Sequence, residues 1–325
     1  MKPTTLLTLL LTTSASAATL PRNANPPQQH QQQQRQQHRL ALLHTLTPAP
    51  AASQFRLLAA TTESVKGGAI LTTDQPFASA QGTFRVPDAK VPTTGPTANN
   101  PVGVYAASFW VGIDSARPTT TTTTGGPSAD ACGGGLALRA GVDVFYDGTF
   151  GGPQTPFAWY QFAPAMGSEK GFEGFAVAAG DLVRFTLEAG SGGGGGDDDK
   201  KEVVVVAENF GGNVTCANGA TPVVSVRQVL PASTTAGGAR LCAKEAAWMV
   251  EDFPLAGLPD FPVALANFTS VAFGGAGVTL ADGSKKDVTG TEVLDVRLQQ
   301  QGGRLTSCEV VDGKKVKCDR VVGDN

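Results

Sequence analysis

The chain has 325 residues, of which 41% are hydrophobic, and a formal net charge of −3 at pH 7. All three histidines, His30, His38 and His44, lie near the N-terminus, so a body released from that segment has no imidazole. This excludes Ser-His-Asp and Cys-His catalysis and any histidine-ligated metal. There is also no P-loop motif, and we expect neither a metal nor another cofactor. Any chemistry of the body must therefore use carboxylates, amides, hydroxyls or arginine.

Charge is distributed unevenly along the chain. Residues 1–62 contain five cationic residues and no acidic one, whereas the other 20 Lys and Arg and all 28 Asp and Glu lie from residue 63 onward. The body therefore has a formal charge of −8. An acidic body argues against a nucleic-acid partner.

The first residues have the pattern of a secretory signal. A lysine follows Met1, an apolar run covers Leu6–Leu11, and Ala15-Ser16-Ala17 provides a small-residue cleavage site. We predict a signal peptide over residues 1–17 and a secreted, extracellular product. No later run is long and apolar enough to cross a membrane, so no membrane partner is expected, and we expect a monomer.

Residues 18–62 form a basic leader with a Gln-rich tract at Gln28–Gln37 and Pro-rich flanks. Such a segment cannot bury a core of its own. A basic leader before an acidic body predicts a prosegment that is held by electrostatic attraction and released when carboxylates protonate. A disordered tail of accidental charge is an equally good interpretation.

From residue 63 onward the sequence predicts a β-sandwich. Gly is abundant, Val, Thr and Phe recur in short runs between turn residues, and no helical period persists for three turns. Candidate strands cover Gly68–Thr72, Gln81–Val86, Ala106–Asp114, Leu136–Phe145, Phe157–Ala163, Leu182–Leu187, Glu202–Glu208, Val223–Val229, Ala247–Phe253 and Val263–Phe273, with weaker ones at Gly277–Leu280 and Glu292–Leu298.

Three of these strands alternate between an apolar face and a face with aromatic and charged residues. Alternate residues of a strand share a face. The second face contains Trp110 and Asp114 on one strand, Arg139 and Asp143 on the next, and Trp159 and Gln161 on the third. This pattern predicts a core on one side of the sheet and a concave binding surface on the other.

Glu251 lies within the run Trp248-Met249-Val250-Glu251-Asp252-Phe253. Strand alternation places it between Met249 and Phe253 on one face. A carboxylate between two large apolar side chains is poorly solvated, and this favours its neutral form. The alternative is an edge-strand glutamate that faces water, and the hexapeptide by itself favours that alternative.

Five cysteines in a secreted chain predict disulfides with one cysteine left over. Cys308 and Cys318 flank an Asp-Gly hairpin turn, so they are expected to pair. Cys132 and Cys242 each precede a strand of interest, and their pairing would close a loop worth roughly 4–5 kcal/mol. Cys216 would then be the odd cysteine. Asn213 and Asn267 begin short glycosylation sequons.

Five motifs occur in the order found in the fungal glutamic peptidases, the eqolisin or peptidase G1 family, which the chain resembles from about Gly67 to Phe273. They are Thr83-Phe84-Arg85-Val86-Pro87, Trp110-Val111-Gly112-Ile113-Asp114, Leu138-Arg139-Ala140-Gly141-Val142-Asp143, Ala158-Trp159-Tyr160-Gln161-Phe162, and Leu241-Cys242 followed by Trp248-Met249-Val250-Glu251-Asp252-Phe253. The resemblance implies an all-β, two-sheet antiparallel β-sandwich of the concanavalin A-like type. It also implies a Cys132–Cys242 disulfide.

The resemblance further implies a catalytic dyad of Glu and Gln that hydrolyses a polypeptide. Glu251 matches the Glu, which activates water and then protonates the leaving amine. Arg139 stands at the Gln position, and this is a departure because a guanidinium only donates hydrogen bonds whereas an amide also accepts them. Activity is therefore expected to be weak or lost, and the alternative is a non-catalytic protein that binds peptide or glycan.

The remaining expected site residues come from the same motifs. They are the substrate-binding residues Trp110, Asp114, Asp143, Trp159, Gln161 and Phe253. The expected partners are a polypeptide and the chain's own basic prosegment.

Overall fold

The structure is a computed structural model of the full chain. It describes residues 64–93, 95, 103–116, 136–148, 152–163, 166, 168–190, 202–231, 241–252, 254–255, 258–298 and 301–321. The expected signal peptide and prosegment, Cys132 and Phe253 lie outside the described residues, so the structure does not test the predictions made for them.

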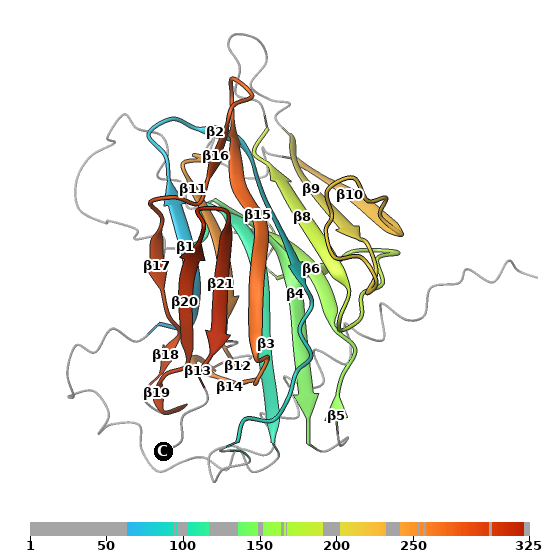
Figure 1. The fold of residues 1–325 in the computed structure, drawn as a ribbon, viewed down its shortest axis with the longest axis vertical. Coiled ribbons are helices and arrows are strands. Elements are labelled where there is room, and N and C mark those ends of the chain that lie inside the picture. The colour runs from blue at the N-terminus through green and yellow to red at the C-terminus, as the bar shows by residue number, and fades with distance from the viewer. Residues whose placement is uncertain are drawn as a thin grey trace, which may run out of the picture.

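Two large sheets make up the fold, as Figure 1 shows. None of the described residues lies in an α-helix, and none forms a helix long and apolar enough to cross a membrane. The nine-stranded sheet has the order β17 (Glu292–Leu294), β1 (Lys66–Thr72), β11 (Glu245–Glu251), β3 (Val104–Ile113), β4 (Ala137–Asp147), β6 (Phe157–Ala163) and β7 (Lys170–Gly171), with β14 (Ala264–Leu265) on β3 and β5 (Gly152–Pro153) on β4.

The second sheet has eight strands, and β15 and β21 lie in front in Figure 1. Its order is β10 (Val224–Pro231), β9 (Glu202–Asn209), β8 (Leu182–Glu188), β2 (Phe77–Arg85), β15 (Ser270–Leu280), β21 (Lys315–Arg320) and β20 (Thr306–Val311), with β16 (Lys285–Asp287) on β15. Two small sheets pair β12 (Pro254–Leu255) with β13 (Leu258–Pro262), and β18 (Arg297–Leu298) with β19 (Gly303–Arg304). The all-β, two-sheet antiparallel prediction is confirmed.

The core lies between the two large sheets. Phe109 of β3 is fully buried, and its ring packs 6.2 Å from that of Phe84 on β2. The Phe84 ring in turn lies 5.1 Å from that of Phe273 on β15. Trp248 of β11 also reaches across, because its Nε1 donates to the Gln81 carbonyl of β2 at 2.8 Å. These contacts hold the outward-facing residues of β3 and β11 on a rigid support.

One predicted strand, Val263–Phe273, was wrong. The chain breaks around Thr269, which has a φ of 63°, and only Ala264–Leu265 and the strand starting at Ser270 are extended. Left-handed backbone at a non-glycine residue interrupts strand pairing. Conversely, β15 continues to Leu280 across an irregular register between Gly274 and Gly277, so Gly277–Leu280 is not a separate strand.

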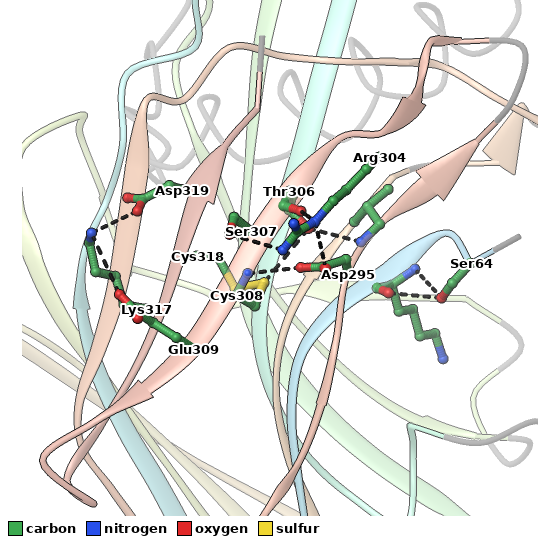
Figure 2. The surroundings of a disulfide bond; sticks show 12 residues. Ser64, Asp295, Arg304, Thr306, Ser307, Cys308, Glu309, Lys317, Cys318 and Asp319 are labelled. Atoms are coloured by element: carbon green, nitrogen blue, oxygen red, sulfur yellow. Dashed lines mark hydrogen bonds and ion pairs between the residues drawn. A yellow bond between two sulfur atoms is a disulfide. The ribbon is translucent and has the colours of Figure 1, made fainter. Parts of the chain in front are cut away.

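The β20–β21 hairpin contains the predicted Cys308–Cys318 disulfide, shown in Figure 2. The two cysteines are directly opposite each other, and Asp312 and Gly313 turn the chain with φ values of 53° and 65°. Asp295 accepts from the Cys308 amide and from Arg304 Nε, both at 2.8 Å. This pairing is confirmed.

The other predicted cysteine pairing and the sequons stay predictions. The Cys132–Cys242 bond involves a residue outside the described ranges. Cys216 is exposed and belongs to no disulfide among the described residues. Asn213 is exposed, whereas the Oδ1 of Asn267 already accepts from the Thr269 amide at 3.0 Å.

Candidate functional site

Strand register places the candidate residues on the face of the nine-stranded sheet that points away from the core. Strands β11, β3, β4 and β6 lie side by side. Their aligned residues form three successive rows on this face: Glu251, Ser108, Asp143 and Phe157; then Met249, Trp110, Gly141 and Trp159; then Ala247, Gly112, Arg139 and Gln161. Arg139 and Glu251, which the resemblance assigns to a catalytic dyad, thus lie on one surface.

Glu251 has two hydrogen-bond donors next to it. Trp110 Nε1 donates to Oε2 at 2.7 Å, and Nη1 of Arg139 donates to the same oxygen at 3.3 Å. The side chains of Arg139 and Glu251 are 19% and 15% exposed, so this ion pair is largely shielded from water. Among the described residues, no donor contacts Oε1. Glu251 thus has one engaged oxygen and one open oxygen.

Arg139 also links Glu251 to a third strand. Its Nη2 donates to Oε1 of Gln161 on β6. Because the guanidinium is planar and rigid, these two contacts fix its position between β11 and β6. Gln161, Arg139 and Glu251 therefore form a continuous polar chain across the sheet.

The two tryptophans of the expected substrate-binding set are buried and do not form an exposed aromatic surface. Trp110 is 0% exposed and Trp159 is 2% exposed. The guanidinium carbon of Arg139 lies 5.5 Å from the Trp110 ring centroid and 5.7 Å from that of Trp159, within the range of a cation–π contact. Gly141 permits this packing, since a Cβ there would lie 2.6 Å from the Trp110 Cβ.

Asp143 is a supporting residue and not a surface residue. It is 0% exposed, and its Oδ1 accepts from Ser108 Oγ at 2.7 Å and from Trp159 Nε1 at 2.6 Å. These bonds orient the Trp159 ring. Its assignment to substrate binding stays a prediction, and in the structure its carboxylate is fully buried. Ser108, which the sequence reasoning missed, shares a face with Trp110 by simple alternation.

Asp114 also has a structural position. Its φ is 51°, and its carboxylate accepts from the backbone amides of Ala243, Lys244 and Glu245 at 2.8, 3.3 and 3.2 Å. Burial raises the pKa of Asp114 above its ordinary value, although these hydrogen bonds act in the opposite direction. Asp114 therefore holds the chain at the start of β11, and its assignment to substrate binding stays a prediction.

Lys66 is a site residue that the sequence reasoning did not include among its candidates. It pairs with Glu251 in the β1–β11 register, and its Nζ lies 5.5 Å from the Trp110 ring centroid. The ammonium donates to the carbonyls of Ser115 and Ala116 at 3.1 and 3.4 Å. Burial lowers the pKa of Lys66, and the Glu251 charge partly offsets this effect. The sequence does contain a signal for this residue, because Lys66 is a charged residue at the start of the otherwise apolar strand Lys66–Thr72.

The described residues contain no group of three or more His, Cys, Asp or Glu side chains that could hold a metal ion. The arrangement offers a carboxylate with one open oxygen, an adjacent guanidinium and an amide. These groups suit acid–base chemistry on water or the binding of a polar chain.

The sequence profile of the Peptidase A4 family matches residues 64–320. Two solved structures with the same fold are scytalido-glutamic peptidase with a peptide-based transition state analogue, and SCP-B, an eqolisin family member, with the tripeptide Ala-Ile-His. The identities are 24% and 23%, and the TM-scores are 0.53 and 0.51. The match with the first covers 80% of this chain and 100% of that chain, and the match with the second covers the same shares. No curated protein sequence matches this chain.

Proposed function

Because the chain belongs to the Peptidase A4 family, we propose that it is a secreted glutamic-type endopeptidase that hydrolyses polypeptides slowly in acid solution. The observation that carries this proposal is the environment of Glu251. One oxygen is held by Trp110 and Arg139, and the other has no donor among the described residues.

Glu251 is the acid–base group in this proposal. Its Oε1 accepts a proton from a water molecule as the water oxygen bonds to the peptide carbonyl carbon. The carbonyl oxygen then carries the negative charge of the tetrahedral intermediate. Glu251 returns the proton to the amide nitrogen, and the carbon–nitrogen bond breaks to give an acid and an amine. No group other than water is consumed.

Arg139 explains why the rate is low. It stands at the position of the family Gln, and its N–H groups can stabilise the oxyanion. It cannot accept a hydrogen bond from the attacking water, since a guanidinium has no acceptor. Its contact with Oε2 also holds Glu251 in an ion pair in the absence of substrate. Both effects oppose activation of water without preventing substrate binding.

A second candidate is a non-catalytic protein that binds peptide on this face. The hydrogen-bonded chain of Gln161, Arg139 and Glu251 favours it, because each of the three side chains already has a partner within the chain. Glycan binding has less support, since Arg139 already lies near both indole rings and the rings are buried.

Secretion, removal of residues 1–17 and release from residues 18–62 form part of the same proposal. The support for them is the signal pattern and the basic leader. The matured protein would then act as a monomer.

The test is proteolysis of a denatured protein at several pH values between about 2 and 6, because a general base must be ionised and the ordinary pKa of Glu lies within this range. The matured protein and its Glu251→Gln variant are assayed side by side for new amino termini. The proposal expects slow cleavage that disappears in Glu251→Gln. If neither protein cleaves but both bind the denatured substrate, the non-catalytic candidate is correct. If cleavage persists unchanged in Glu251→Gln, both assignments of this site are wrong.

A further inference from the structure

A separate groove crosses the face of the eight-stranded sheet that points away from the core. Its volume is about 770 Å³. Its floor includes Gln81 and Thr83 of β2 and the segment Gly274–Gly277 of β15. The loop at Thr215–Asn218 borders it on the side of β8, and the β15–β16 and β20–β21 hairpins border it on the side of β21. It lies on the opposite sheet from Glu251.

Glycine keeps the floor of this groove open. A Cβ added at Gly274 would have the Thr83 carbonyl oxygen as its nearest neighbour, at 3.8 Å. At Gly275 the nearest atom would be Gln81 Nε2 at 3.9 Å. Side chains at these positions would therefore project into empty space, whereas the glycines leave room for a ligand against the sheet.

The groove is basic although the body carries a formal charge of −8. Arg85 and Arg184 are already engaged, the first with the carbonyls of Gly212 and Val214 and the second with Glu208. The remaining cations of the described lining are four exposed lysines, two from each hairpin: Lys285, Lys286, Lys314 and Lys315. Asp287 is the one acidic residue of that lining.

The two hairpins hold these lysines together. The Val288 amide after β16 donates to the Gly313 carbonyl at 3.1 Å, so the tip of the β20–β21 hairpin contacts the chain just after β16. Like charges gathered in this way repel one another, and an anionic ligand relieves the repulsion. Lysine ammonium groups act as flexible point charges, which suits a chain of separate carboxylates.

We propose that this groove binds an extended acidic segment of another polypeptide. The lysines contact its carboxylates, and the amide and hydroxyl groups of Gln81 and Thr83 are available to its peptide groups. An acidic polysaccharide fits less well. Among the described lining residues the only aromatic is Phe84, which is 1% exposed and offers no ring face for a sugar.

The test uses a fluorescein-labelled oligoglutamate peptide, with binding measured by fluorescence anisotropy at neutral pH and low salt. The paired substitution Lys285→Glu with Lys315→Glu, at residues whose strand partners Thr279 and Gly274 line the groove, is expected to weaken binding by about tenfold or more. The matched control, Lys90→Glu with Lys244→Glu, changes the net charge equally at two exposed lysines outside the groove. An equal loss in both variants would show a general charge effect and overturn the proposal.

Gly274→Leu provides a second variant that leaves the charge unchanged. It fills the floor and is expected to weaken peptide binding while the melting temperature shows that the protein stays folded. Unchanged peptide binding in a folded Gly274→Leu protein contradicts the proposal, as does tighter binding of polygalacturonate through the same lysines. Glu251→Gln should not affect any of these measurements, so the result is independent of the proposed peptidase function.

Discussion

Arg139 and Glu251 come from strands that are not neighbours, yet Nη1 of the arginine lies 3.3 Å from Oε2 of the glutamate. Strand β3 separates the two strands, and its Trp110 donates to the same oxygen. The candidate base is therefore held from two directions by donors that cannot accept a proton. Neither donor can accept a hydrogen bond from an attacking water molecule.

Arg139→Gln is expected to increase acid proteolysis. Glutamine supplies both an acceptor for the water and a donor for the oxyanion, and it removes the ion pair at Glu251. Since one oxyanion donor typically contributes roughly 10²–10³ in rate, even a partial gain is measurable as kcat on a denatured substrate.

Arg184→Gln is the matched control for this experiment. It removes an arginine whose Nε lies 2.6 Å from Glu208 on the other sheet. It should leave the proteolytic rate unchanged. A rate that rises equally in both variants, or that does not rise in a folded Arg139→Gln protein, would argue against the inhibitory role of Arg139.

The sequence predicted the fold well because strand alternation directly determines which residues face the core. The expectation that Arg139 and Glu251 lie on one face came instead from the resemblance, which assigns both residues to a dyad. The sequence did not predict that Asp143 and Asp114 would be internal supports, since alternation assigns a face but not the depth of a side chain. Lys66 was missed because its role depends on the β1–β11 register, and that pairing joins residues far apart in the chain.

Asp114 should make the protein more stable in acid. Burial raises its pKa above the ordinary 3.8, so the folded protein holds this proton more tightly than the unfolded chain does. This contribution is fully present below pH 3.8 and is lost as the pH rises through the pKa of the folded state. When the pH is raised from about 3 to 6, the unfolding free energy of the Asp114→Asn protein should therefore fall less than that of the native protein. Urea denaturation at each pH measures both values.

Asp282 provides a control of opposite sign. It is exposed, and hydrogen bonds from Ser284 lower its pKa. Its contribution is present above pH 3.8 and is lost as the pH falls, so Asp282→Asn should not reproduce the effect of Asp114→Asn. Parallel stability curves for the native protein and Asp114→Asn would exclude the role assigned to burial.

The leader should bind the body more tightly at neutral pH than in acid. Carboxylates of the −8 body lose their charge on acidification, whereas the leader arginines stay charged. A synthetic peptide of residues 18–62 is titrated against the matured protein in low salt, at neutral pH and at about pH 3. A peptide with its four arginines (Arg22, Arg35, Arg39 and Arg56) replaced by Gln is the control. Equal binding by the two peptides would show that charge does not hold the leader.

The bond from Trp159 to Asp143 should stabilise the fold more than the bond from Trp248 to Gln81. Both tryptophans are buried and donate through Nε1, at 2.6 and 2.8 Å, but one acceptor is a carboxylate and the other a backbone carbonyl. A hydrogen bond to a charged group contributes about 1.5–3 kcal/mol, against about 0.5–1.5 kcal/mol for a neutral one. Substitution by Phe removes the donor and a similar volume in both cases, so the difference in unfolding free energy reports the acceptor together with the contact between the Trp159 ring and Arg139.

Trp159→Phe should therefore be the more destabilising substitution, by about 1 kcal/mol in urea denaturation at neutral pH. Equal losses would mean that the Asp143 carboxyl group is no stronger an acceptor here than the Gln81 backbone carbonyl.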